Sequence, residues 1–479
     1  MAPDAFGARL PGAARYAALT HPLIAPLIMR PWFDRLALPL ISRWFFPLSR
    51  AWAAAAACNG DVARFLDEAY GGKARRSTPG ARARKFVGAV EARQRDYEAA
   101  ERHWRQVLFD SGGAANDETS IATQVRRRDA AQAFMAARAS ALPLHMARPF
   151  AWVRLEIAPP RDVESGHGAR LADERAAFPV PPRAPVSVSN PVPSQAGRDR
   201  WLQFASPVLG DAAWARVTEP ADGGTKAPSL IFLHGIAMET EFWSGLVDPS
   251  LPLAQRGIRL IRPEGPWHGR RRPPGWFGGE FAMGRGPLGF MELFQAWVAE
   301  VAALIAWARE TGGGPVAVGG VSLGALTAQM VAAAARHWPK EARPDALLLI
   351  APSGDMIDVA QSGSLSRALD IPGAMQRAGW SAGALARWGP LLQPQSQPGP
   401  GRGRRPGALS GRAGARAVLG YSQGQPVPAP AGSLFGLSRP GSRAAAARPP
   451  GQAAGFGLTP PCSGRVRGYI PAHDRDPDR

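Results

Sequence analysis

The sequence has few cysteines and lysines, and acidic residues are missing from most of its last hundred positions. Cys58 and Cys462 are the only cysteines among 479 residues, which excludes a disulfide scaffold. Neither has a partner at metal-binding or redox spacing, so we predict no metal site. Apolar residues make up 45% and charged residues 20% of the chain, a balance that excludes disorder throughout. The length suits two or three domains.

The net charge of +19 is spread unevenly along the chain. Residues 393–479 hold 12 arginines, no lysine and three aspartates, together with 16 glycines and 14 prolines. Glycine and proline at this density, without a period, are typical of a disordered tail. Because the tail offers few aromatic rings on which bases could stack, the high charge does not favour a nucleic-acid partner.

Residues 1–158 are predicted to form a helical N-terminal region. Apolar residues there recur on one helix face, at Phe86, Val90, Tyr97, Trp104 and Leu108. The stretch 16–57, aromatic and arginine-containing in its second half, has two interpretations. It either contacts a membrane surface peripherally or packs as helices on a globular body, and we favour packing. No secretion signal is recognised, so we expect a cytoplasmic protein, membrane-associated under the first interpretation.

A Pro-rich linker is predicted for residues 159–198, and an α/β domain for residues 199–392. Four short apolar runs are typical of strands buried on both faces: 229–233, 258–261, 316–318 and 346–350. Helix-like stretches follow two of them, at 288–309 and 325–337. This order predicts a parallel sheet with helices on both sides.

A Gly-x-Ser-x-Gly motif lies at the end of the third apolar run, with Ser322 at its centre. In such a motif the serine occupies a strained turn between strand and helix, and the glycines let the two elements approach. The turn lifts the hydroxyl above the sheet, so Ser322 is the candidate nucleophile. The N–H of Leu323 then faces the developing oxyanion. A second copy of the motif, around Ser422, precedes closely spaced prolines that forbid a helix, so we favour Ser322.

A second element supports this assignment, because His234, Gly235 and Ile236 follow the first apolar run. An oxyanion loop is expected there, with the N–H of Ile236 as the second donor. His234 and Gly235 are predicted to line the substrate site. His234 could be a catalytic base, but we favour a histidine that shapes the loop.

These motifs resemble those of the alpha/beta-hydrolase superfamily over about residues 200–390. Three segments further resemble the group that includes abhydrolase domain-containing protein eighteen: FLHGIAMETEFW at 232–243, EGPWHGRRRPP at 264–274 and GVSLG at 320–324. The resemblance implies hydrolysis of an ester or related acyl bond, with no cofactor and a small-molecule or lipid ester as substrate. It also implies an acid and then a histidine after the nucleophile in chain order.

The chain departs from this order after Ser322. Only two histidines follow, and His337 is about four helical turns beyond the nucleophile, too far along its helix to reach it. His473 is therefore the only nominal base, and Asp355 is a nominal acid for which a turn role is favoured. No apolar strand is recognised after Ile350, so the C-terminal strands of the fold are predicted to be missing or replaced by the tail.

Two explanations of this departure remain. The chain is either a non-catalytic hydrolase fold, or its C-terminus is not native, and we hypothesise a frameshift near residues 390–400. The alternatives to a serine hydrolase are accordingly a binding protein with the same fold and a peripheral membrane protein. The sequence also places Arg270 and Arg271 on the active-site edge of the sheet, where they could hold a phosphate or carboxylate of the substrate. A solvated loop is the favoured alternative for both arginines.

Overall fold

The fold was analysed in a computed structural model of the whole chain. The structure describes residues 39–392 except 73–79, 111–115, 172–176, 222–223, 225, 239–252, 351 and 354, together with 394, 431–432 and 468–469.

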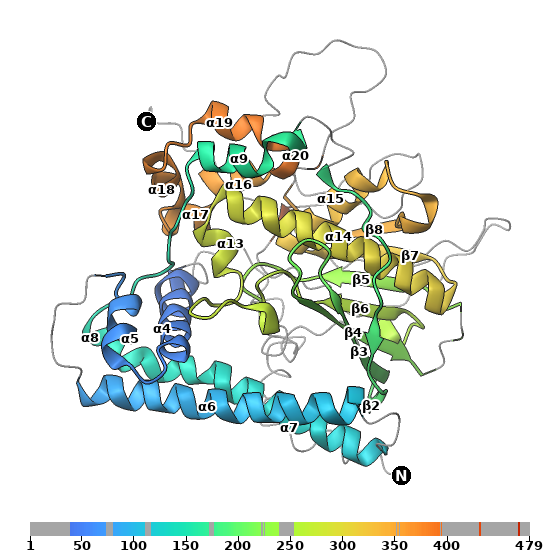
Figure 1. Cartoon of the computed structure of the whole chain (residues 1–479), viewed down its shortest axis with the longest axis horizontal. Helices are drawn as coiled ribbons and strands as arrows, with labels where there is room; N and C mark the ends of the chain where they lie inside the picture. Colours follow the sequence, from blue (N-terminus) through green and yellow to red (C-terminus); the bar gives the residue numbers. More distant parts are fainter. Residues whose placement is uncertain are drawn as a thin grey trace.

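The described chain is built on an eight-stranded mixed sheet, whose strands lie towards the right in Figure 1. Its strands are β1 Ser187–Val188, β2 Val192–Ser194, β3 Gly197–Ala205, β4 Ala212–Pro220, β5 Ser229–Leu233, β6 Arg259–Pro263, β7 Val316–Val321 and β8 Ala346–Ile350. They are ordered β1-β3-β4-β6-β5-β7-β8, and β2 pairs with β3. The four predicted strands are confirmed as β5 to β8 and pair in parallel. The remaining pairs, which involve the unpredicted strands β1 to β4, are antiparallel, so the sheet as a whole is mixed.

The two faces of the sheet separate cleanly along each strand. In β5, Ile231 and Leu233 join the main core, whereas Leu230 joins a smaller cluster on the opposite face. This alternation is the two-residue period of a strand. Strand pairing extends this alternation across the sheet, because Leu230 is opposite Leu260 of β6 and Ala317 of β7. Each face therefore needs its own cover.

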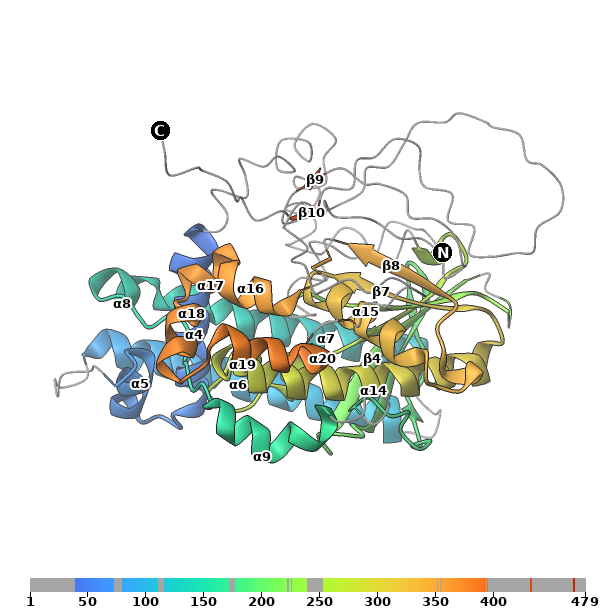
Figure 2. The same ribbon diagram turned by 90° about the horizontal axis from the view of Figure 1, so that it is seen from above.

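Two helices cover the first face, α14 Pro287–Gly312 and α15 Leu323–Ala335. They pack against each other and against β5 and β7, as the view from above shows (Figure 2). The predicted helices at 288–309 and 325–337 are thereby confirmed. In the described part of the chain, α14 is the one helix long and apolar enough to cross a membrane, and most of that apolar window is buried inside the protein.

The N-terminal region covers the second face where the sheet is antiparallel. Helix α6, Ala81–Arg105, continues into the π-helical turn η3, Gln106–Asp110, and together they bring Trp104 and Leu108 onto the strands. The Trp104 ring centroid is 5.2 Å from that of Trp201 in β3 and 6.1 Å from that of Trp214 in β4. Helices thus lie on both sides of the sheet as predicted, but the N-terminal region supplies one of the two layers.

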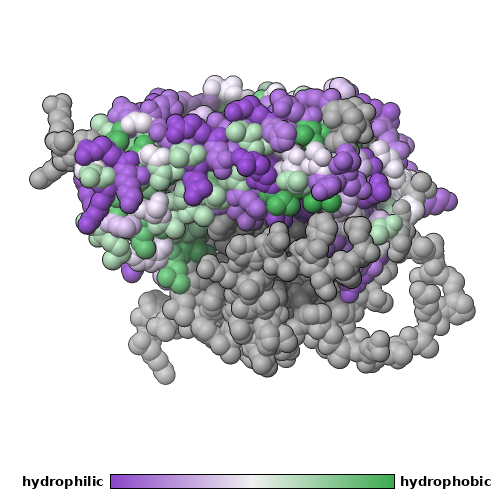
Figure 3. All heavy atoms as spheres, turned by 90° about the horizontal axis from the view of Figure 1, so that it is seen from below, coloured by the Kyte–Doolittle hydropathy of each residue, from purple (hydrophilic) through white to green (hydrophobic). Residues whose placement is uncertain are grey.

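The other helices of this region build a bundle beside the sheet (Figure 1). They are η2 Ile41–Phe45, α4 Phe46–Ala57, α5 Val62–Ala69, α7 Asp117–Ala136, η4 Ala137–Ala141 and α8 Leu142–Ala147. Trp52 of α4 is fully buried, and its Nε1 donates to the carbonyl of Phe134 at 2.9 Å. Residues 41–57 thus pack on the globular body, the favoured interpretation; residues 16–38 lie outside the described residues, so membrane contact through 16–57 stays a prediction. From below, the side of α6 and α7, hydrophilic side chains dominate the described surface (Figure 3).

The segment 159–198 contains more structure than the predicted linker. It holds helix α9, Pro160–Leu171, and the strands β1 and β2 at the sheet edge. Arg170 of α9 donates to the side chain of Gln295 in α14 at 2.7 Å, so the helix is tied to the body of the molecule. Prolines in this segment suggested a linker, but Pro160 begins α9 and Pro193 lies within β2, whereas the others lie outside helices and strands.

The described chain ends in short helices after β8: α16 Met356–Ser362, α17 Ser364–Ala368, α18 Ile371–Arg377, α19 Ala382–Arg387 and α20 Gly389–Leu392. Within the described residues no later strand pairs with β8, which is an edge of the sheet; the prediction that the C-terminal strands are missing or replaced concerns residues that lie mostly outside the described part of the chain. The short strands β9 Ala431–Gly432 and β10 Gly468–Tyr469 pair only with each other.

A buried charge cluster joins the N-terminal region to the sheet. Arg270, in the 3-10 turn η5 (Gly269–Arg271) after β6, donates to Glu101 of α6 at 2.9 Å and also pairs with Glu264. Its guanidinium lies over the rings of Trp104 and Trp214. Burial raises the pKa of Glu101, but Arg270 and Arg127 outweigh it and lower this pKa to about 2. Both carboxylate and cation are therefore charged in the folded protein.

Replacing Arg270 by methionine should lower the free energy of unfolding by about 3–5 kcal/mol, because Glu264 and Glu101 lose a buried cation. Urea unfolding followed by circular dichroism measures this change. The matched control is Arg126→Met, which removes an exposed pair with Asp96 and should change stability by less than about 1 kcal/mol. Equal effects of the two substitutions would contradict the role assigned to Arg270.

Candidate active site

Ser322 occupies a strained turn between β7 and α15. Its backbone has φ 54° and ψ −116°, a conformation that non-glycine residues rarely adopt. The N–H of Ser322 donates to the carbonyl of Ile350 at 3.0 Å, and its own carbonyl accepts from Leu326 in the first turn of α15. The turn is thus held from the strand side and the helix side.

The glycines of the motif are required by close backbone contacts. A Cβ at Gly320 would lie 2.6 Å from the carbonyl oxygen of Leu233 at the end of β5. A Cβ at Gly324 would collide with the same carbonyl and would lie 2.7 Å from that of His234. The sequence-based expectation that these glycines let strand and helix approach is confirmed, and the neighbouring strand β5 is part of the reason.

The predicted oxyanion loop lies beside the turn. Strand pairing places Leu233 opposite Gly320, so the residues that follow both strands meet at one edge of the sheet. A Cβ built on Gly235 would be 3.6 Å from the Cβ of Ser322. The structure therefore brings Gly235 and Ser322 together, with Ile236 next in the chain. Leu323 begins α15, where the first backbone N–H groups have no helical acceptor.

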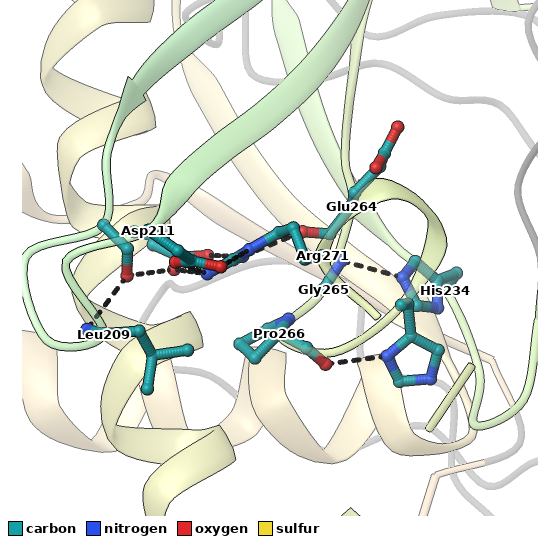
Figure 4. Close-up of polar contacts among 10 residues, drawn as sticks. Leu209, Asp211, His234, Glu264, Gly265, Pro266 and Arg271 are labelled. Atoms are coloured by element: carbon teal, nitrogen blue, oxygen red, sulfur yellow. Dashed lines mark hydrogen bonds and ion pairs between the residues drawn. The ribbon is translucent and has the colours of Figure 1, made fainter. Parts of the chain in front are cut away.

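His234 holds the backbone of this loop (Figure 4). Its Nε2 accepts the N–H of Gly265 at 2.9 Å, and its Nδ1 is 2.8 Å from the carbonyl oxygen of Gly235. Because Nε2 accepts, Nδ1 carries the proton and donates. Both ring nitrogens are thus bound to backbone, which agrees with the favoured interpretation of His234 as a loop-shaping residue. A trans peptide turns the N–H of Ile236 away from the Gly235 carbonyl that His234 holds.

His268 lies against this loop and was not assigned a role from the sequence. Its ring centroid is 4.7 Å from that of His234, and Nδ1 donates to the carbonyl of Pro266 at 2.9 Å. Burial, with a smaller contribution from His234, holds the pKa of His268 well below 6.5, so the ring is neutral. Its Nε2 is buried and has no hydrogen-bond partner among the described residues. The Trp-His-Gly segment at 267–269 was visible in the sequence, but nothing there signalled burial.

The prediction that Arg270 and Arg271 bind substrate is wrong, because both guanidiniums are committed within the protein. Arg271 donates to Asp211, to Glu300 of α14 and to the carbonyl of Glu264 at 2.7–3.2 Å, as Figure 4 shows in part. These contacts use all five N–H groups of the side chain. The favoured alternative, a solvated loop, is also wrong, since both side chains are buried. Arginine in a loop gives no sequence signal for distant acidic partners.

Neither a base nor an acid partner for Ser322 is assigned in the described part of the chain. Asp355 is exposed and caps α16, where its carboxylate accepts the N–H of Asp358 at 2.9 Å. This is the favoured turn role. His337 follows the far end of α15, as expected. His473 lies outside the described residues, so its role stays a prediction. No cluster of three potential metal ligands is found among the described side chains.

Comparison with known proteins places this architecture in a family. The profile of the alpha/beta hydrolase family matches residues 230–475, which is just over half of the chain and includes both Ser322 and His473. No curated protein is detectably similar in sequence.

Solved structures resemble parts of the chain. A cold-adapted esterase from an Arctic intertidal metagenomic library is 20% identical, with a TM-score of 0.24; the match covers 31% of this chain and 60% of the esterase. The chain thus spans less than two thirds of that protein. For an S-formylglutathione hydrolase from Agrobacterium tumefaciens the values are 15% identity, TM-score 0.31, and coverage of 43% and 73%.

An acetyl xylan esterase from Paenibacillus sp. R4 is 15% identical, with a TM-score of 0.33 and coverage of 50% of this chain and 75% of that one. The family match covers the strand β5, the turn at Ser322 and the helices around them. The chain belongs to the alpha/beta hydrolase family.

Proposed function

We propose that the protein is a serine hydrolase that cleaves an ester or related acyl bond, with Ser322 as the nucleophile. The observation that carries the proposal is the strained backbone of Ser322, at φ 54°, on a turn packed against the loop 234–238. Strain of this kind costs about 1–3 kcal/mol and persists where the surroundings impose it, often at active sites. Family membership supports the same assignment.

The proposed reaction is acyl transfer to the serine, followed by hydrolysis. The Ser322 hydroxyl attacks the substrate carbonyl while a base takes its proton, and the N–H groups of Leu323 and Ile236 stabilise the oxyanion. Water then attacks the acyl-enzyme and releases the acid. His473 is the candidate base, since it is the last histidine of the chain and lies within the family match.

The proposed substrate carries no charged group near the scissile bond. Arg270 and Arg271 are neutralised by Glu101, Glu264, Asp211 and Glu300, so they leave no free cation for a phosphate or carboxylate. A small-molecule or lipid ester fits this better than an anionic substrate. The motifs at 232–243 and 264–274, with the helical N-terminal region, favour the group of abhydrolase domain-containing protein eighteen.

A fluorophosphonate probe should label the full-length protein at Ser322, because only an activated serine reacts at a useful rate. Ser322→Ala should abolish labelling, as measured by in-gel fluorescence and by mass spectrometry of the modified peptide. The matched control is Ser422→Ala, the serine of the second Gly-x-Ser-x-Gly motif, which should label like the wild type. Absence of labelling in the wild type would favour a non-catalytic member of the family.

Relief of strain at Ser322 should also be measurable as stability. Ser322→Gly should raise the free energy of unfolding by about 1 kcal/mol, because glycine adopts a positive φ without strain, whereas Ser322→Ala keeps the strain. Urea unfolding measures both variants. At Ser140, on ordinary helical backbone, the same change to glycine should lower stability by about 0.5–1 kcal/mol. Destabilisation by Ser322→Gly would contradict the strained turn.

A further inference from the structure

Glu280 is a fully buried carboxylate that holds the segment following the histidine-containing loop. It begins the short helix α13, Glu280–Gly284, and is inaccessible to solvent. Its Oε2 accepts the N–H of Phe277 at 3.1 Å, which fixes the turn in front of the helix. Its Oε1 accepts the N–H of Arg154 at 2.9 Å, from the chain that leaves the N-terminal region. One side chain therefore binds the backbone of its own turn and a backbone N–H that lies 126 residues earlier in the chain.

The turn that Glu280 fixes presses on the oxyanion loop. Gly279 has φ 78°, and a Cβ there would lie 2.6 Å from Nε2 of His268 and 3.0 Å from the backbone N of Ala237. Gly279 thus lies in direct contact with the residue after Ile236, the proposed oxyanion donor. Ala237 itself has φ 57°, so this part of the loop is held in a strained conformation. A shift of the 277–280 turn would release it.

On its other side Glu280 meets a cation of the N-terminal region. Nη1 of Arg50, in α4, is 3.7 Å from Glu280 Oε2 and also donates to the carbonyl of Gly275 in the same segment. Nη2 of Arg50 pairs with Glu68 of α5 at 3.5 Å. The carbonyl of Gly284 at the end of α13 accepts the N–H of Glu156 at 2.7 Å. Helix α4 and segment 154–156 therefore clamp α13 from both ends.

We propose that Glu280 is a positioning residue that couples the N-terminal helical region to the oxyanion loop. In this account the docked α4 and segment 154–156 hold the turn at Gly279, and that turn keeps Ala237 and the preceding N–H of Ile236 in place beside Ser322. The expected effect of this coupling on catalysis rests on the proposed hydrolase function. The effect on loop structure does not depend on that function.

The charge on Glu280 makes the clamp sensitive to pH. Burial raises the pKa of Glu280 to about 7, and Arg50 and the two amide donors oppose this rise. The charged groups that face it are Arg50 from α4, Glu68 from α5 behind Arg50, and Arg154 from the chain after α8; His268 across the turn stays neutral. Because the folded pKa lies above the usual value, ionisation costs stability as pH rises towards 7. The ion pair with Arg50 is complete only above that pH.

The first test compares Glu280→Gln with Glu219→Gln in the full-length protein. Glutamine keeps the shape of the glutamate side chain but loses one hydrogen-bond acceptor and the charge. Glu219 serves as the control because it pairs with Arg200 on β3, away from the loop. Hydrogen exchange of the amides of residues 235–238, read by mass spectrometry, should be at least about tenfold faster in Glu280→Gln and unchanged in Glu219→Gln. In the wild type, protection corrected for intrinsic rates should decrease from pH 6 to 8, because the closed loop favours the neutral carboxyl of Glu280, and this step should vanish in Glu280→Gln.

Unchanged exchange, or a retained pH step, in Glu280→Gln would overturn the proposal. If Glu280→Gln does not fold, as judged by circular dichroism, Arg50→Gln is measured by the same criteria. This substitution leaves in place both hydrogen bonds that backbone N–H groups donate to Glu280. With p-nitrophenyl butyrate as substrate, kcat should fall about ten- to a hundredfold while KM changes little. A wild type that hydrolyses no ester would remove the proposed function, and the exchange data would still decide the coupling.

Discussion

The guanidinium of Arg270, buried between Glu101 of the N-terminal region and Glu264 of the sheet, is the contact on which the architecture depends. Three charged groups out of water are costly unless each is paired, so the helices and the sheet must dock together. Neighbouring arginines extend the joint, because Arg271 binds Asp211 and Glu300, and Arg272 lies 4.4 Å over the ring of Trp52. Three successive residues thus fasten the loop after β6 to α6, to the turn before β4, to α14 and to α4.

This joint explains how the second face of the sheet is covered where its strands are antiparallel. α14 and α15 pack on one face, and Trp104 of the N-terminal region packs on Trp201 and Trp214 of the other. The same loop continues from Arg270 to the turn at Gly279, which touches Ala237 in the loop after β5. The N-terminal region is therefore structurally continuous with the site around Ser322.

Local signals in the sequence were sufficient to predict the parallel strands and the turn at Ser322. Apolar runs mark strands buried on both faces, and a glycine-flanked serine marks a turn whose geometry is set by its immediate neighbours. The antiparallel strands β3 and β4 escaped recognition, because Arg198, Arg200 and Arg216 interrupt their apolar pattern. The roles of Arg270, Arg271 and Glu280 could not be read, since their partners are distant in sequence. The catalytic base stays a prediction, because His473 lies outside the described residues.

The central claim is that the N-terminal region and the hydrolase sheet form one cooperative unit joined through Arg270. Native-state hydrogen exchange of the full-length protein in increasing urea tests this most directly, by comparing amides of α6 with amides of β5 and β7. The account predicts that both sets exchange through one opening with the same free energy and the same dependence on urea. Opening of α6 at a clearly lower free energy, with β5 and β7 still protected, would contradict it.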